Sequence, residues 1–107
     1  MTTTETRLQR RIRLDFPEPG SAQEILRLLA DLPRQTGDNT LGTERVHAAI
    51  ILLAQRDIMR FRRALTLSTR DWRDVLVAAG LADDDWPTRL DQELGPVTSS
   101  SPTQDSK

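Results

Sequence analysis

The stretch "TERVHAAIILLA", residues 43–54, determines how the rest of the chain must pack. Thr43 has the side chain of a helix N-cap, and Glu44 places an acid in the first turn, where the helix dipole favours it. Apolar side chains then cover most of the helix circumference: Val46, Ala48, Ala49, Ile50, Ile51, Leu52 and Leu53. Because a helix that is apolar nearly all round must be buried, we predict that residues 43–56 form the central helix of an all-α fold.

The segment before this helix is amphipathic. In "SAQEILRLLADLP", residues 21–33, Ser21 and Glu24 have the spacing of a capping box. Apolar side chains follow at the period of one helix face, at Ile25, Leu28, Leu29 and Leu32. Pro33 disfavours helical geometry at the residue before it. We therefore predict a helix over residues 21–32 and a loop over "RQTGDNTLGT", residues 34–43.

Three more helices are predicted after the central one, over residues 57–65, 68–79 and 86–94. Asp57 is a suitable N-cap for the first, and Ser68 with Asp71 repeats the capping-box spacing before the second. Gly80 and Gly95 suit the ends of the second and third helices. The residues expected to be most buried are Leu29, Ile50, Leu53, Phe61, Trp72, Leu76 and Leu90.

The N-terminal segment "RIRLDF", residues 11–16, has a different period. Ile12, Leu14 and Phe16 alternate with charged residues, which is the pattern of a half-buried strand. A lone strand is not stable by itself, so we predict an extended arm over residues 1–20 that lies on the helices of a monomer. The alternative is a strand edge that pairs with a second copy, giving a homodimer, or with a partner strand.

The C-terminal segment "PVTSSSPTQDSK", residues 96–107, has one apolar side chain, Val97, and is expected to be a disordered tail. The predicted fold is therefore one compact all-α domain over residues 21–95. About five short helices form a bundle or orthogonal array, with the extended arm before them.

Composition excludes several classes of protein. The chain has 107 residues, with 15 basic and 16 acidic side chains, and its net charge of −1 does not favour a polyanionic partner. The absence of cysteine excludes disulfides and thiolate chemistry and suits a reducing cytosol, so we expect a cytoplasmic protein. The longest apolar run, residues 48–54, is far shorter than the roughly 20 residues of a membrane span.

Charge is distributed unevenly. Residues 1–14 hold four arginines and one acid, whereas residues 83–93 hold five acids and one arginine. Such asymmetry either steers association or is neutralised by internal pairing. A basic surface for an acidic protein partner could combine the two segments rich in arginine, and its candidate residues are Arg11, Arg13, Arg56, Arg60 and Arg63, with Arg7 and Arg10 beside them. A solvated helix face, or pairing with the acidic segment, is the structural alternative.

The stretch "DVLVAAGLADDDW", residues 74–86, is spaced like a helix-turn-helix DNA reader. Its second helix would have to lie against phosphates, yet it carries Asp83, Asp84, Asp85 and two further acids. Carboxylates near the DNA backbone are repulsive, so we predict no specific DNA binding and interpret Gly80 as an ordinary helix end.

Other site motifs are weak or missing. The three consecutive aspartates lack the alternate spacing of a calcium loop and fit helix capping. His47 is the only histidine, so it cannot build a zinc site without other strong ligands, and we interpret it as hydrogen-bonded and partly buried. No phosphate loop, dinucleotide fingerprint or nucleophile elbow is present. We therefore predict no catalytic residue, no metal and no cofactor.

The blocks "STRDWRDVLVAAGLADDDWPTRLDQELG", residues 68–95, and "PEPGSAQEILRLLADLP", residues 17–33, resemble small helical proteins from GC-rich bacterial genomes. The resemblance implies a bacterial origin and carries no activity. The function that we expect is therefore a non-enzymatic protein-interaction or regulatory module. The alternatives are a nucleic-acid-associated module that uses the arginine-rich faces and an enzyme that uses carboxylates in an unrecognised pocket.

Overall fold

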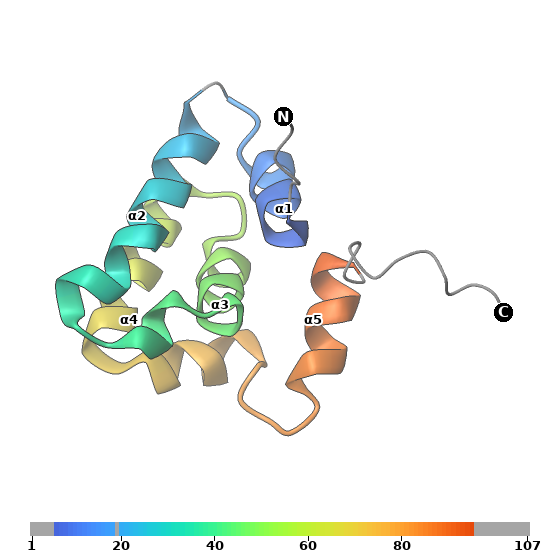
Figure 1. Ribbon diagram of the computed structural model, residues 1–107. Coiled ribbons are helices and arrows are strands. Elements are labelled where there is room, and N and C mark those ends of the chain that lie inside the picture. Colours follow the sequence, from blue (N-terminus) through green and yellow to red (C-terminus); the bar gives the residue numbers. More distant parts are fainter. Residues whose placement is uncertain (1–5, 19, 96–107) are drawn as a thin grey trace, which may run out of the picture.

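Helix α3 (Glu44–Ala54) is the central helix of the protein, as its apolar circumference predicts. The computed structural model describes residues 6–18 and 20–95, and α3 lies near the middle of it (Figure 1). It packs against α1, α4 and α5. Its fully buried side chains include Val46, Ile50 and Ile51. Thr43 caps its first turn by accepting a hydrogen bond from the amide of Val46, as expected.

The all-α fold class is confirmed. Five α-helices and one short 3₁₀ helix make up the described residues, and none of these residues forms a strand. In chain order the elements are α1 (Arg7–Asp15), α2 (Ser21–Thr36), the 3₁₀ helix η1 (Asn39–Gly42), α3, α4 (Ile58–Ala79) and α5 (Trp86–Leu94). The prediction also had about five helices, but two of its errors cancel. It missed helix α1, and it divided α4 into two helices.

The missed helix is α1, and the prediction of an extended arm or strand over "RIRLDF" is wrong. Thr6 and Gln9 form a capping box, with each side chain accepting a hydrogen bond from the other residue's amide at 2.9–3.0 Å. Leu8 and Ile12, one turn apart, are both buried, whereas Leu14 is 69% exposed. The segment is a helix rather than a strand because α2, α3 and α5 all lie against it, and helical geometry places Leu8 and Ile12 together on its buried side. No described residue therefore offers the strand edge that a homodimer of paired arms would need.

Helix α2 continues beyond its proline. Pro33 was expected to end the helix at Leu32, yet helical geometry extends to Thr36 and ends at Gly37, which has a φ of 73°. Because proline has no amide hydrogen, the carbonyl of Leu29 lacks its usual donor four residues on. The predicted capping box is also wrong, because Ser21 is the first helical residue and Gly20 occupies the N-cap without a side-chain hydrogen bond.

Helix α4 joins the two helices predicted for residues 57–65 and 68–79. Asp57 caps it as expected, accepting from the amides of Met59 and Arg60 at 2.8 and 3.3 Å. Asp71 is non-helical, with φ −157° and ψ 94°, and accepts a hydrogen bond from the amide of Arg73. The Ser68 hydroxyl instead donates to the carbonyl of Leu65. The chain therefore bends at Asp71, and the predicted capping box between Ser68 and Asp71 does not form.

The core is one cluster of buried side chains to which all five helices contribute. Five of the seven expected core residues are buried in it: Leu29, Ile50, Phe61, Leu76 and Leu90. Leu53 and Trp72 are only half-buried at its edge, so that part of the prediction is wrong. Trp86 is also half-buried, with the guanidinium of Arg45 4.6 Å from its ring centre. The predicted tail over residues 96–107 lies outside the described residues, as do residues 1–5.

Candidate functional site

Arg7 was expected on a basic surface, but it is buried among carboxylates. Its guanidinium makes a two-point contact with Glu44, with Nε and Nη2 each 2.9 Å from one carboxylate oxygen. Its Nη1 donates to the Asp91 carboxylate and to the carbonyl of Gly95. The hydrogen bonds to Glu44 raise the pKa of Arg7, although burial opposes them. For this residue, the alternative of internal pairing with the acidic segment is confirmed.

Two of the predicted partner-binding residues, Arg11 and Arg56, meet at a buried carboxylate. The side chain of Asp15 is only 3% exposed, and the Arg11 Nε lies 3.1 Å from both of its oxygens. Arg11 also donates to the carbonyl of Glu93. Arg56 is 77% exposed and approaches the same carboxylate at 3.6 Å. Arg11 therefore makes these contacts within the protein, whereas the exposed Arg56 makes one longer ion pair with Asp15.

Of the other three predicted residues, Arg60 and Arg63 are one turn apart on α4, whereas Arg13 is on α1. Arg13 is exposed in the last turn of α1 and lines a shallow cavity beside Phe16. Arg60 donates to the side chain of Gln55 across the turn before α4. Arg63 lies in a separate depression on α4. The cavities beside Arg13, Arg56 and Arg63 are each lined by one of the five residues.

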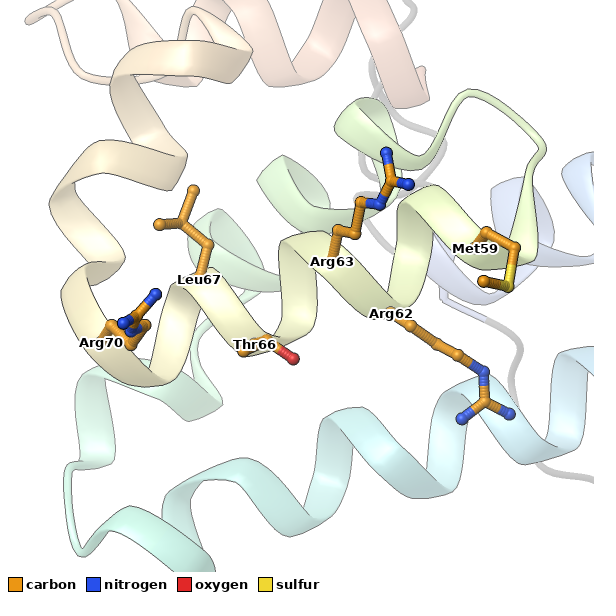
Figure 2. Close-up of a pocket in the computed structure, with 6 residues that line it drawn as sticks. All are labelled: Met59, Arg62, Arg63, Thr66, Leu67 and Arg70. Atoms are coloured by element: carbon orange, nitrogen blue, oxygen red, sulfur yellow. The ribbon is translucent and has the colours of Figure 1, made fainter.

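The depression that contains Arg63 is the best candidate for a binding surface. It is open and measures about 420 Å³, and Figure 2 shows its lining side chains along one stretch of α4. The residues recur at the spacing of a helix face, and we call them the basic α4 face: Met59, Arg62, Arg63, Thr66, Leu67 and Arg70. A side chain three or four residues from another lies on the same side of a helix, so these six form one stripe.

The arginines of this face have no partner in the part of the chain that the structure describes. Arg62, Arg63 and Arg70 are exposed, and none makes an ion pair or hydrogen bond with any of residues 6–18 and 20–95. The stretch Ile58–Arg70 contains four arginines and no acid. Arg62 and Arg63 therefore differ from Arg7 and Arg11, which are held by carboxylates of the described residues, whereas Arg70 also lines a cavity that contains Asp38 and Asp71.

Apolar surface lies beside these arginines. Met59 is 59% exposed at the start of the face, and Leu67 is half-buried two turns later. The sequence prediction included Arg63 but missed Met59, Arg62 and Arg70. The lack of any acid over thirteen consecutive residues was the available signal. That signal identifies a basic stretch, but it does not show which arginines lack internal partners.

His47 is hydrogen-bonded and partly buried, as predicted. Its Nε2 lies 2.7 Å from the carbonyl of Leu41 in η1. Burial lowers the pKa of His47, and hydrogen bonds to the carbonyls of Leu41 and Leu29 oppose this effect in part. The Leu29 carbonyl is the one that lost its helical donor to Pro33. The His47 ring therefore lies near the carbonyl that Pro33 leaves without its helical donor.

A more polar cavity of about 370 Å³ lies at the bend of α4 and includes Ser68, Thr69 and Asp71. Ser68 and Thr69 donate their hydroxyls to carbonyls of their own helix, and Asp71 caps the turn that follows. These groups are engaged locally, and no histidine or lysine lines the cavity to activate a nucleophile.

Residues 6–18 and 20–95 contain neither a cluster of metal ligands nor a membrane-spanning helix. No cluster of three or more histidine, aspartate or glutamate side chains is arranged to hold a metal ion within this part of the chain. None of its helices is long and apolar enough to cross a membrane.

No family model, curated protein or solved structure matches the chain. The resemblance to small helical proteins from GC-rich bacterial genomes therefore stays a prediction.

Proposed function

We propose that this protein is a non-enzymatic protein-interaction module that binds an acidic surface of a partner protein through the basic α4 face. The observation that carries the proposal is a group of three exposed arginines, Arg62, Arg63 and Arg70, that have no ion pair or hydrogen bond with the described residues. Guanidinium groups bind carboxylates in two-point contacts, and a cluster of them attracts an acidic patch.

The apolar residues of the face favour a protein as the ligand. Methionine and arginine are enriched at protein–protein interfaces, and Met59 lies exposed beside the arginines. A flexible thioether side chain adapts to an apolar surface, which a sugar–phosphate backbone does not present. The proposed interaction therefore combines charge pairing with burial of Met59.

The same face argues against a symmetric homodimer through α4. A two-fold axis would place the arginines of one copy against those of the other, and like charges in contact are repulsive. We therefore propose a monomer in the absence of its partner. A bacterial origin, implied by the resemblance, and a cytoplasmic location, expected from the absence of cysteine, belong to the same proposal.

Nucleic acid is the second candidate ligand. It is favoured by the four arginines and no acid of Ile58–Arg70, which could contact phosphates. The face contains no aromatic side chain on which a base could stack. The net charge of −1 also gives no long-range attraction to a polyanion.

Affinity capture with the full chain as bait tests the proposal. The test variant combines Arg62→Gln, Arg63→Gln and Arg70→Gln. The control is Arg10→Gln, which changes an exposed arginine of α1. We expect a specific protein in the capture by the wild type and by the control, and its loss from the capture by the triple variant. Identical captures for all three baits would contradict the proposal, and loss after nuclease treatment would favour nucleic acid.

A further inference from the structure

We infer that the segment that occupies the basic α4 face is an acidic amphipathic helix of the partner protein. This inference rests on the proposed function and adds the form of the ligand. The face is a stripe along one helix rather than a pocket, and it combines charge with apolar surface in a fixed order.

The length of the face fits a short helix. Met59 and Arg70 are eleven residues apart on α4, so the stripe extends about 16 Å along the helix axis at 1.5 Å per residue. This distance equals about three turns of a second helix packed alongside. An amphipathic helix that binds in this way presents apolar residues one and two turns apart.

The order of side chains sets the chemistry of the occupant. Met59 and Leu67 are eight residues apart, or roughly two turns, and Arg62 and Arg63 lie between them (Figure 2). Arg70 lies beyond Leu67. A matching helix has apolar residues about two turns apart and carboxylates flanking them, so that each arginine meets an acid.

The acidic segment of a second copy does not have this form. Asp83, Asp84 and Asp85 lie in the bend before α5, outside any helix. Within α5, Asp91 already accepts from Arg7, and Leu90 and Leu94 are buried in the core. The described residues therefore contain no acidic helix with a free apolar face, and the charge complementarity points to a different protein.

Labelled probes and the full chain test this inference. The first probe is a peptide of about 18 residues in which leucines recur at helical spacing and glutamates flank them. The second has the same composition in scrambled order. The third is a mixed DNA duplex of about 20 base pairs. Binding is measured by fluorescence anisotropy at about 0.15 M salt, and peptide helicity by circular dichroism.

We expect the patterned peptide to bind about tenfold more tightly than the scrambled one and to gain helicity on binding. The Arg62→Gln, Arg63→Gln, Arg70→Gln variant should weaken this binding by about tenfold or more, and Met59→Gln by about threefold. Arg10→Gln should leave it unchanged. All five substituted residues are exposed, and thermal melts of each variant check that the fold is retained.

The opposing outcomes separate this inference from the proposed function. Equal, arginine-dependent binding of both peptides would overturn the helical occupant and leave the acidic protein partner in place. Absence of peptide binding, with an arginine-dependent capture retained, would have the same meaning. Tighter binding of the duplex than of either peptide would overturn both proposals. A wild-type mass of two chains that falls to one in the triple variant would identify a second copy as the occupant.

Discussion

Arg7 and Glu44, the first residues of α1 and α3, are joined by two parallel hydrogen bonds of 2.9 Å. The two residues are 37 positions apart, and Asp91 of α5 completes the contact from 84 positions away. One guanidinium therefore fixes the relative position of three helices. It also explains why the basic N-terminal segment does not offer all its charge to a partner.

Replacing Arg7 with alanine should destabilise the fold by about 2 kcal/mol. Removal of one member of a buried ion pair costs about 3–5 kcal/mol, and the partial exposure of Glu44 and Asp91 lowers that figure. Urea unfolding measures the change. Arg10→Ala, at an exposed residue of the same helix, is the control and should cost about 0.5 kcal/mol or less. Equal effects of the two substitutions would show that the Arg7 contact does not hold the helices.

Truncation of Ile50 to alanine should cost about 2–5 kcal/mol, because it removes buried methylene groups and leaves a cavity. Ile50 is fully buried in α3, the helix that packs against three others. Denaturant unfolding gives the free energy, and Val77→Ala at an exposed position of α4 is the control. A loss for Ile50→Ala of about 1 kcal/mol or less would mean that α3 is not central.

Stability should decrease as the pH falls below the ordinary pKa of histidine, about 6.5. Burial lowers the pKa of His47 in the folded state, so the unfolded chain binds the proton first. The contribution of neutral His47 is therefore complete above pH 6.5 and is lost as the pH falls through the folded-state pKa. Urea unfolding at several pH values between about 7.5 and 5 measures this slope.

The control for this pH dependence is His47→Asn. His47 is the only histidine, so no other side chain has its ordinary pKa in this range. The variant should be less stable at neutral pH, because the carbonyl of Leu41 loses its ring partner. Its stability should change less than that of the wild type down to pH about 5. A slope equal to that of the wild type would assign the dependence to other groups.

Glycine at position 56, in the turn between α3 and α4, should relieve backbone strain and so favour the folded state. Gln55 and Arg56 are consecutive non-glycine residues with positive φ angles, 50° and 66°. Arg56→Ala removes the side chain and keeps the strained backbone, whereas Arg56→Gly also relieves the clash of Cβ with the backbone. We expect the glycine variant to be more stable than the alanine variant by about 0.5–1 kcal/mol in thermal or urea melts. The reverse order would mean that the turn is not strained.

Thr6→Ala should destabilise the protein by about 1 kcal/mol, because it removes the side chain that caps α1. Thr6→Ser keeps the hydroxyl and should be close to the wild type. Amide hydrogen exchange at Arg10 to Asp15 provides a direct readout, since loss of the cap should reduce protection there. Unchanged protection in the alanine variant would contradict a helix that depends on this cap.

The sequence by itself determined the all-α class, the central position of α3 and most of the core. These features follow from side chains whose placement is decided within one helix. Residues 44–54 are apolar nearly all round, so no orientation of that helix leaves it exposed. The N-caps Thr43 and Asp57 act within their own first turns and could likewise be predicted.

Only the tertiary structure decided the rest, because each remaining feature depends on groups distant in sequence. Residues 11–16 have the period of a strand, whereas Leu8 and Ile12 have helical spacing, and the neighbouring helices together with Glu44 and Asp91 select the helix. Helix α2 continues through Pro33 to Thr36, which the local preference against helix before a proline did not indicate. Arg7 and Arg63 look alike in sequence, yet one is buried against carboxylates and the other is not. Which arginines remain available for a partner is decided by where the fold brings its acids.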